Sequence, residues 1–202
     1  MTDTKRAASS VPIHDLIASR WSPRAIDQDT RVTRQQITAL LEAARWAPSC
    51  FGDQPWRFLV WDRFADSDAW QQAFDCLAEG NQTWVRQCPV LLAAVAHSEF
   101  ERNGKPNRWG QYDTGAASEN LCLQAAALEL VAHQMGGFDK TRLTAAFGIP
   151  ERFTPMAMIA VGAPAAPETL PEKFREAETA PRNRRPLPEL AFDGRWGSGF
   201  RI

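Results

Sequence analysis

The segment LEAARWAPSCFGDQPWRF, residues 41–58, joins a predicted helix to a predicted strand through a loop of helix-breaking residues. Upstream of it, Thr33 and Gln36 have the form of a capping box, and the apolar residues that follow recur at helical spacing. Pro48 ends this helix, because proline lacks the backbone N–H that a helix interior needs. After the loop, the apolar run over residues 56–61 favours a strand.

Two other apolar runs predict buried strands, one over residues 89–96 and one over residues 156–161. The long apolar stretch between them predicts a helix that begins with Asp113 or Thr114 as its cap and ends near Ala132. Apolar side chains occur nearly all round this helix, so we expect it to be buried on all sides.

Weaker local signals complete the outline of the chain. Gly80-Asn81 predicts a break, and Gly136-Gly137 predicts a tight turn. The sequence further predicts short helices over residues 13–20, 68–77 and 139–148, a surface loop over residues 99–109 and an extended arm over residues 163–188.

The composition indicates a globular protein of one domain. Of its 202 residues, 44% are hydrophobic and 23% are charged, which is enough apolar surface for one core. The formal net charge of -1 indicates no nucleic-acid partner and no acidic membrane surface. No apolar run reaches the roughly 20 residues of a membrane span, and the polar residues 1–10, which we expect to be disordered, lack the apolar core of a signal peptide.

The cysteines do not indicate a metal site. Cys50, Cys76, Cys88 and Cys122 have no C-x-x-C spacing and do not cluster with the three histidines. We therefore predict neither a bound metal nor a disulfide framework. Scattered thiols of this kind suit a reducing compartment, which favours a cytoplasmic location.

Cations stand near both ends of the chain, at Arg20, Arg24, Arg182, Arg184 and Arg185. A phosphate monoester carries about -1.5 to -2 charge and needs two or three such donors when it is partly buried. The same residues could form a solvated charge run, which composition alone favours. Hydrolase, P-loop and G-x-G-x-x-G dinucleotide motifs are missing, so the residues alone leave both interpretations open.

The chain resembles the nitroreductase family over almost its whole length, on four motifs in the family's order. They are RWSPR at residues 20–24, LEAARWAPS with QPWRF at residues 41–58, GGFD at residues 136–139, and VGAP at residues 161–164 followed by RNRRPL at residues 182–187. Four motifs with matching spacing favour the phosphate interpretation of the cations.

The resemblance implies a fold, a cofactor and an assembly. The fold is α+β, with a central, mostly antiparallel sheet flanked by helices and an extended C-terminal arm that reaches over a partner subunit. Residues 11–192 would form a single FMN-binding domain, with flexible tails at residues 1–10 and 193–202. The protein would be a homodimer that holds FMN at the interface between its subunits.

The same resemblance assigns positions around the phosphate and the flavin. Arg20 and Ser22 match contacts of the phosphate and ribityl chain, and Arg182 and Arg184 match a late basic pair at the phosphate. Arg24 matches a cation at the pyrimidine edge, where it would stabilise negative charge on the flavin. The full expected cofactor-binding set is Arg20, Trp21, Ser22, Arg24, Pro48, Ser49, Cys50, Asn81, Gln134, Met135, Gly136, Gly137, Arg182 and Arg184.

The remaining members of this set would contact the ring system. Residues 48–50 match a loop that packs on the ring from the other subunit, with Cys50 as a small packing residue. Asn81 matches a pyrimidine contact, and residues 134–137 match a turn whose backbone approaches flavin N5. The chain departs from the family at Gly52, where Asn is common, and at Gly136, where some relatives have Glu.

The resemblance implies an FMN-dependent oxidoreductase with ping-pong kinetics. Hydride would pass from NAD(P)H through flavin N5 to an electron-poor small molecule such as a nitroaromatic or a quinone, and no side chain need act as a catalytic acid or base. Two alternatives stay open: another FMN-dependent reaction, such as reductive dehalogenation, and a non-catalytic flavin-binding module.

A few other side chains carry expectations of their own. His14 and His97 are expected at the surface or at helix caps, and Trp46 and Trp56 in the core. His133, Trp84 and Trp109 are candidates for the lining of the pocket.

Overall fold

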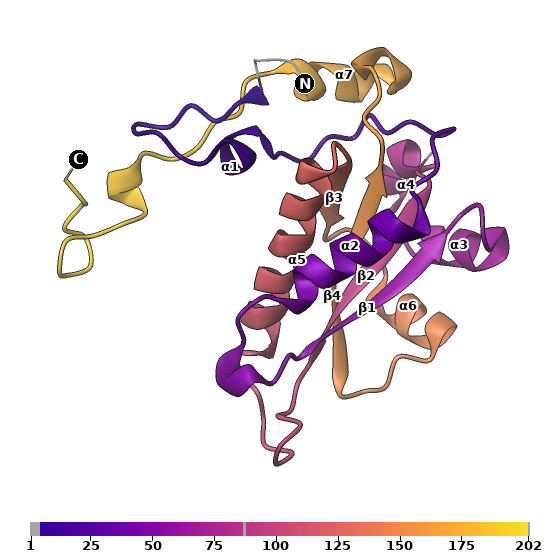
Figure 1. Ribbon diagram of the computed structural model, residues 1–202, viewed down its shortest axis with the longest axis horizontal. Coiled ribbons are helices and arrows are strands. Elements are labelled where there is room, and N and C mark those ends of the chain that lie inside the picture. The colour runs from indigo at the N-terminus through magenta and orange to yellow at the C-terminus, as the bar shows by residue number, and fades with distance from the viewer. Residues whose placement is uncertain (1–4, 87, 202) are drawn as a thin grey trace.

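A four-stranded antiparallel sheet lies at the centre of the computed structural model, which describes residues 5–86 and 88–201 (Figure 1). The strands are β1 (Trp56–Asp62), β2 (Val90–His97), β3 (Val131–Met135) and β4 (Phe153–Gly162), in the spatial order β1-β2-β4-β3. Every neighbouring pair is antiparallel. The α+β architecture and the antiparallel sheet are therefore as predicted.

Helices lie on both faces of this sheet, and two further helices near the chain ends lie beyond it (Figure 1). They are α1 (Asp15–Ser19), α2 (Arg34–Arg45), α3 (Ser67–Phe74), α4 (Glu79–Val85), α5 (Gly110–Ala127), α6 (Lys140–Phe147) and α7 (Glu172–Thr179). Short 3-10 turns lie at Cys50–Gly52, Pro167–Thr169 and Leu187–Glu189. Helices α2 and α5 pack on one face, and α3, α4 and α6 pack on the other (Figure 1).

The central strand β2 divides the core into two layers. Its side chains alternate between the faces of the sheet, so Leu91 and Val95 join one buried cluster while Leu92 and Ala94 join the other. Every residue of β2 is buried. A strand buried on both faces needs a covering layer on each side, which explains why its sequence is apolar without alternation.

Local signals fixed several helix ends as expected. Thr33 and Gln36 form the predicted capping box at the start of α2. Asp139 caps α6 by accepting from the N–H of Arg142, and Gly148 ends that helix in the left-handed conformation, at φ 61°.

Both predicted ends of the long helix α5 were wrong. It begins at Gly110, ahead of Asp113 and Thr114, and neither of these residues caps it. It ends at Ala127, and the chain turns at Glu129, whose φ is 57°, into strand β3. Pairing of residues 131–135 with β4 overrode the helical pattern. The helix also leaves one side exposed, so it is not buried all round.

Two predicted irregularities are absent from the described residues. Gly80 and Asn81 lie inside α4 and do not break the chain. Gly136 and Gly137 form no tight turn; they continue from β3 in an extended connection to α6. The Gly137 carbonyl accepts from the N–H of Ala78, and this contact carries the chain past the start of α4.

The N-terminal segment and the C-terminal arm run side by side beyond the sheet (Figure 1). The arm contains α7, a helix that the sequence did not predict, and continues from there in extended form. Lys5 is buried, and its Nζ donates to the carbonyl of Ala177. Residues 1–4 and 202 of the predicted flexible tails lie outside the described residues.

Within residues 5–86 and 88–201, no helix has the length and apolar character to cross a membrane. The same residues contain no cluster of metal-ligating side chains. All four cysteines are free thiols. Burial raises the pKa of Cys88 to about 12 and that of Cys122 to about 11, which leaves both thiols protonated and unreactive.

The capping box can be tested directly. We expect Thr33→Ala to lower the free energy of unfolding by about 1 kcal/mol, because it removes the acceptor for the N–H of Gln36. Thr38→Ala, at an exposed position of the same helix, is the matched control and should have little effect. Urea unfolding measures both. Equal losses in the two variants would contradict a specific role for the cap.

Candidate functional site

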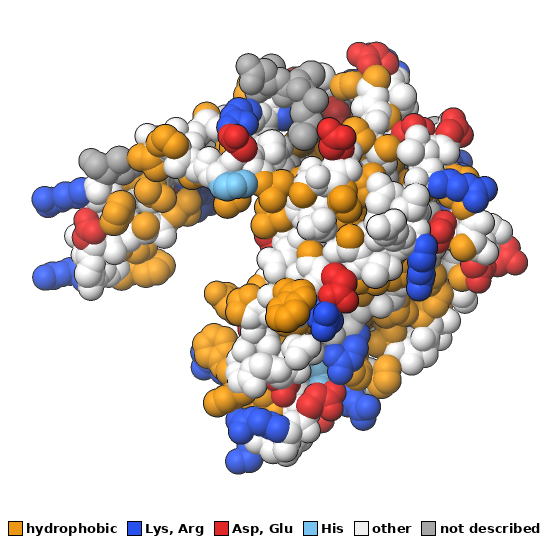
Figure 2. Space-filling model, in the orientation of Figure 1, with side chains coloured by type: hydrophobic (Ala, Val, Ile, Leu, Met, Phe, Trp, Pro, Cys, Tyr) orange, Lys and Arg blue, Asp and Glu red, His pale blue; other side chains and the backbone are white. Residues whose placement is uncertain are grey.

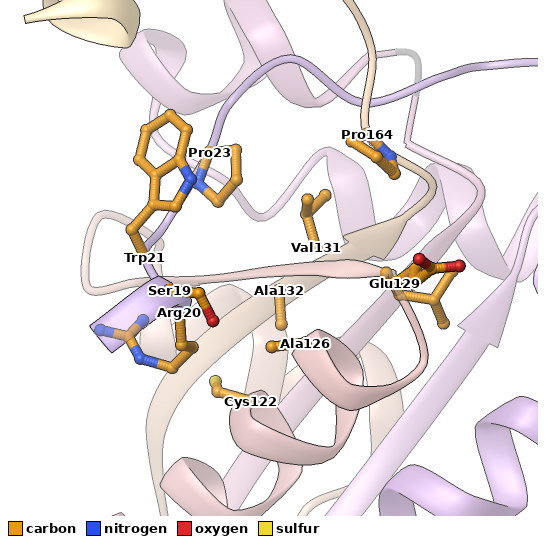
Figure 3. A pocket seen from close by; sticks show the side chains of 11 residues that line it. Ser19, Arg20, Trp21, Pro23, Cys122, Ala126, Glu129, Val131, Ala132 and Pro164 are labelled. Atoms are coloured by element: carbon orange, nitrogen blue, oxygen red, sulfur yellow. The ribbon is translucent and has the colours of Figure 1, made fainter. Parts of the chain in front are cut away.

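A pocket of about 380 Å³ lies where the N-terminal segment crosses the sheet edge (Figure 3). Arg20, Trp21 and Pro23 line it from this segment, and Cys122 and Ala126 from α5. The start of β3 and Pro164, which follows β4, complete the lining. The structure therefore brings the predicted residues Arg20 and Trp21 to a cavity beside the edge strand.

The C-terminal arm is tied to this segment through Arg182. Its two Nη atoms donate to the carbonyls of Arg20, at 2.6 Å, and Ala18, at 2.5 Å. Its Nε is buried and has no partner within the described part of the chain. Burial lowers the pKa of Arg182, and the charges of Arg20 and Arg184 lower it further. Cations thus gather here, as an anion site requires.

Arg20 itself reaches across to α5. Its Nε lies 3.1 Å from Oε1 of Glu119, in an ion pair whose carboxylate is half exposed. Because solvent reaches the carboxylate, it screens this pair and limits its contribution to stability. Arg184, by contrast, is exposed, and the hydrogen bond found for its side chain is to the adjacent carbonyl of Asn183. Its charge nevertheless acts on Arg182, whose pKa it lowers.

Trp84 connects a second group of predicted residues. The guanidinium of Arg24 lies 5.9 Å from the Trp84 ring, and the indole Nε1 donates to Oδ1 of Asn81 at 3.3 Å. Asn81 in turn donates to the carbonyl of Gly137 at 2.9 Å. Three expected flavin contacts, far apart in sequence, are therefore linked through one buried indole.

The two glycines after β3 have different surroundings. A Cβ on Gly137 would lie 2.9 Å from Nδ2 of Asn81, so a larger residue here would push the Asn81 amide from its place. A Cβ on Gly136 would meet nothing within 4 Å. Gln134 and Met135 belong to strand β3; Gln134 is exposed and donates to Sγ of Cys122, and Met135 is buried.

His133 holds the N-terminal segment against β3. Its Nδ1 donates to the carbonyl of Pro23 at 3.0 Å, and its ring lies 4.6 Å from the Trp84 ring. Burial lowers the pKa of His133 to about 4, although the hydrogen bond to Pro23 acts in the opposite direction. The imidazole is therefore neutral at pH 7, and it positions the segment without adding charge.

The loop at residues 48–50 lies elsewhere. Pro48 and Ser49 line a separate pocket with Trp46, and the N–H of Cys50 donates to the buried carboxylate of Asp113 at 3.0 Å. Asp113 is in the first turn of α5, about 13 Å along the helix from Cys122 at a rise of about 1.5 Å per residue. Within one chain, the two parts of the predicted site are separate (Figure 1).

Sequence reasoning missed or misplaced several side chains. The sequence did not indicate that Trp84 and His133 would connect the predicted site residues. It also gave no reason to expect Glu178 beside Arg24 or Lys5 beside Trp21, and both of these charged side chains are buried. His14 caps α1 as expected, whereas His97 is buried against Phe153 and was wrongly placed at the surface.

The tryptophans divided differently from the prediction. Trp56 is in the core as expected. Trp46 is 76% exposed, because it follows the last turn of α2 and points away from the sheet, so its core assignment was wrong. Trp109 is partly exposed at the start of α5, away from the Figure 3 pocket.

Comparison with known proteins identifies the family. The model of the nitroreductase family matches residues 17–163, which include the Arg20–Arg24 segment, the loop at residues 48–50 and the whole sheet. The chain belongs to the nitroreductase family. The predicted family and fold class are thereby confirmed.

The chain is also similar to individual solved and curated proteins. A crystal structure described as an oxidoreductase containing FMN has a TM-score of 0.89 and 36% identity, and covers 97% of this chain and 98% of its own. A 15.4 kDa protein of Mycolicibacterium smegmatis is 35% identical over 148 residues, which are 70% of this chain and 98% of that protein. The major NAD(P)H-flavin oxidoreductase of Aliivibrio fischeri is 30% identical over 91 residues, 45% of this chain and 41% of that protein.

The neutral state of His133 makes a testable contribution to stability. Its folded pKa of about 4 lies below the ordinary value of 6.5, so the unfolded chain binds the proton more readily. Stability present above pH 6.5 is therefore lost as the pH falls toward 4, by an amount on the order of 3 kcal/mol. We expect the free energy of unfolding, measured with urea, to fall less between pH 6.5 and pH 4 in His133→Gln than in the wild type.

His14→Gln is the matched control, because His14 is exposed at the start of α1. It should show the full wild-type loss between pH 6.5 and pH 4. A His133→Gln variant with that same full loss would show that the imidazole is not held neutral.

Proposed function

We propose that this nitroreductase-family chain is an FMN-dependent oxidoreductase that uses NAD(P)H to reduce an electron-poor small molecule, such as a nitroaromatic or a quinone. The observation that carries the proposal is the linked set of Arg24, Trp84, Asn81 and Gly137 beside the cationic Arg20 and Arg182. An FMN-containing structure with a TM-score of 0.89 supports the choice of cofactor.

The residues fit the chemistry of FMN at both ends of that molecule. The buried Nε of Arg182 has no partner among the described residues, and a phosphate oxygen would satisfy it. Arg20 and the exposed hydroxyl of Ser22 lie on the same segment. At the other end, Arg24 and Asn81 offer a cation and an amide to the polar edge of a flavin ring.

In this proposal the side chains bind and orient, and none has to move a proton. When bound, FMN supplies hydride chemistry between the nicotinamide and the acceptor. Arg20 and Arg182 hold the phosphate, and Arg24 fixes a positive charge at the ring edge. The open space over Gly136 leaves room for a flat substrate, which a larger side chain would narrow.

We further propose that the active form is a homodimer, in which the loop at residues 48–50 of one subunit packs over the flavin of the other. Two observations support it: the loop and the cation pocket are separate within one chain, and Phe51 and Tyr112 beside the loop are 74% and 75% exposed. The arm projects from the body and borders an open concavity that a second copy could fill (Figure 2). Its free thiols suit the cytoplasm.

The spectrum of the purified protein tests the cofactor and the reaction. We expect absorption bands at about 370 and 450 nm, bleaching of these bands by anaerobic NADH or NADPH, and their recovery on addition of a nitroaromatic or a quinone. Flavin bands that neither NADH nor NADPH bleaches would contradict the proposed oxidoreductase activity. A colourless protein that FMN cannot reconstitute would contradict the cofactor itself.

The two adjacent glycines provide a matched pair of variants. We expect Gly137→Ala to weaken FMN binding by about tenfold, because its Cβ displaces the Asn81 amide that contacts the ring edge. Gly136→Ala should bind FMN within about threefold of wild type, since its Cβ enters open space. Fluorescence titration of the apoprotein measures both affinities. The reverse order of effects would contradict the assigned position of the ring.

A further inference from the structure

The C-terminal helix α7 places a buried carboxylate against the cofactor segment. Glu178 is 3% exposed, and its Oε1 accepts from the backbone N–H groups of Arg24 and Ala25, each at 2.9 Å. Its Oε2 is also buried and has no hydrogen-bond partner within residues 5–86 and 88–201. A glutamate side chain is seldom buried so completely unless it has polar or charged partners.

Cations surround this carboxylate. The Nζ of Lys5 donates to the carbonyl of Ala177, the residue before Glu178, at 2.8 Å. Burial lowers the pKa of Lys5, while the charge of Glu178 raises it. Arg182 follows beyond the end of α7, in the extended part of the arm, and donates to the carbonyl of Arg20. The carboxylate therefore lies among positive charges, so a test of its role has to separate its charge from its hydrogen bonds.

The same helix also restrains the Arg24 side chain. The guanidinium of Arg24 lies 5.5 Å from the ring of Phe174, one turn before Glu178, and 5.9 Å from Trp84 on its other contact. Helix α7 therefore holds Arg24 twice, by its backbone N–H through Glu178 and by its cationic end through Phe174. These contacts join residues about 150 positions apart in the chain.

We propose that Glu178 is a positioning residue that holds the Arg20–Arg24 segment in the conformation that binds the FMN phosphate, which makes helix α7 of the C-terminal arm part of the cofactor site. This inference rests on the proposed FMN-dependent function. The Glu178 side chain does not contact the cofactor; it acts through the backbone of Arg24 and Ala25. The essential feature is an acceptor oxygen at the reach of glutamate, rather than its negative charge.

Two conservative variants separate reach from charge. Glu178→Gln keeps an oxygen at the same reach and loses the charge, whereas Glu178→Asp keeps the charge and withdraws the oxygen by one methylene. Apoprotein of each variant is titrated with FMN and with riboflavin, which lacks only the phosphate. The readout is the ratio of the two affinities. General destabilisation reduces the competent fraction for both ligands alike and leaves this ratio unchanged.

We expect Glu178→Asp to lower the FMN-to-riboflavin ratio by about fivefold to tenfold, because it releases the segment that carries Arg20 and Ser22, the contacts expected at the phosphate. Glu178→Gln should stay within about threefold of wild type, because the amide oxygen still accepts both N–H groups. Glu176→Ala, at an exposed position of the same helix, is the matched control and should leave the ratio unchanged.

The possible failures are distinguishable. A wild-type protein that binds neither ligand would overturn the proposed function and this inference with it. A wild type that prefers FMN, together with an unchanged ratio in Glu178→Asp, would overturn the inference alone. A Glu178→Gln ratio that falls as far as that of Glu178→Asp would show that charge, and not positioning by an acceptor oxygen, is the role of Glu178.

Discussion

The burial of β2 on both faces constrains everything else in this molecule. All of its residues are buried, and their side chains enter two separate core clusters. Each face must therefore be covered by helices, which leaves no sheet face free for a ligand. The site is consequently restricted to the outer edge of the sheet, where β3 meets the Arg20–Arg24 segment and the C-terminal arm.

At this edge the chain depends on a few long-range polar contacts. Arg182 and Glu178 from the arm bond the backbone on either side of Ser22, and His133 bonds the carbonyl of Pro23 from β3. Each of these groups is wholly or partly buried, so each contact matters more than an exposed one would. The segment is thereby held rigid before any ligand arrives, which reduces the entropy lost on binding.

Local sequence signals predicted much of this fold. The capping box of α2, strand β2 and the α6 boundaries each depend on neighbouring residues, and all of them were found. Strand β3 was missed, because residues 128–132 extend the predicted helical pattern of α5. Only pairing with β4, through residues more than 20 positions away, decides that they form a strand. Gly80-Asn81 predicted a break, but both residues lie in helix α4. Packing of Trp84 and Val85 in the core outweighs the low helix propensity of glycine and asparagine.

In the candidate site, too, the sequence predicted some residues, whereas others depend on long-range contacts. Motif resemblance located Arg20, Arg24, Asn81 and Gly137, and the structure links or gathers them. Motif resemblance could not identify Glu178, because nothing in the sequence distinguishes this glutamate from the others. Only the folded chain shows that α7 brings it to Arg24. Nor could motif resemblance show that the loop at residues 48–50 lies apart from the cations in one chain, because that separation depends on the length of α5.

In the proposed homodimer, each site takes residues from two copies of the chain. The direct test mixes two inactive variants, one with Arg20→Ala and Arg24→Ala, and one with Cys50→Trp in the loop, and refolds them together. If the two parts of the site come from different subunits, random pairing restores one intact site in each mixed dimer, and FMN titration should recover about a quarter of the wild-type sites. A mixture that binds no more FMN than its two components measured separately would contradict the shared site.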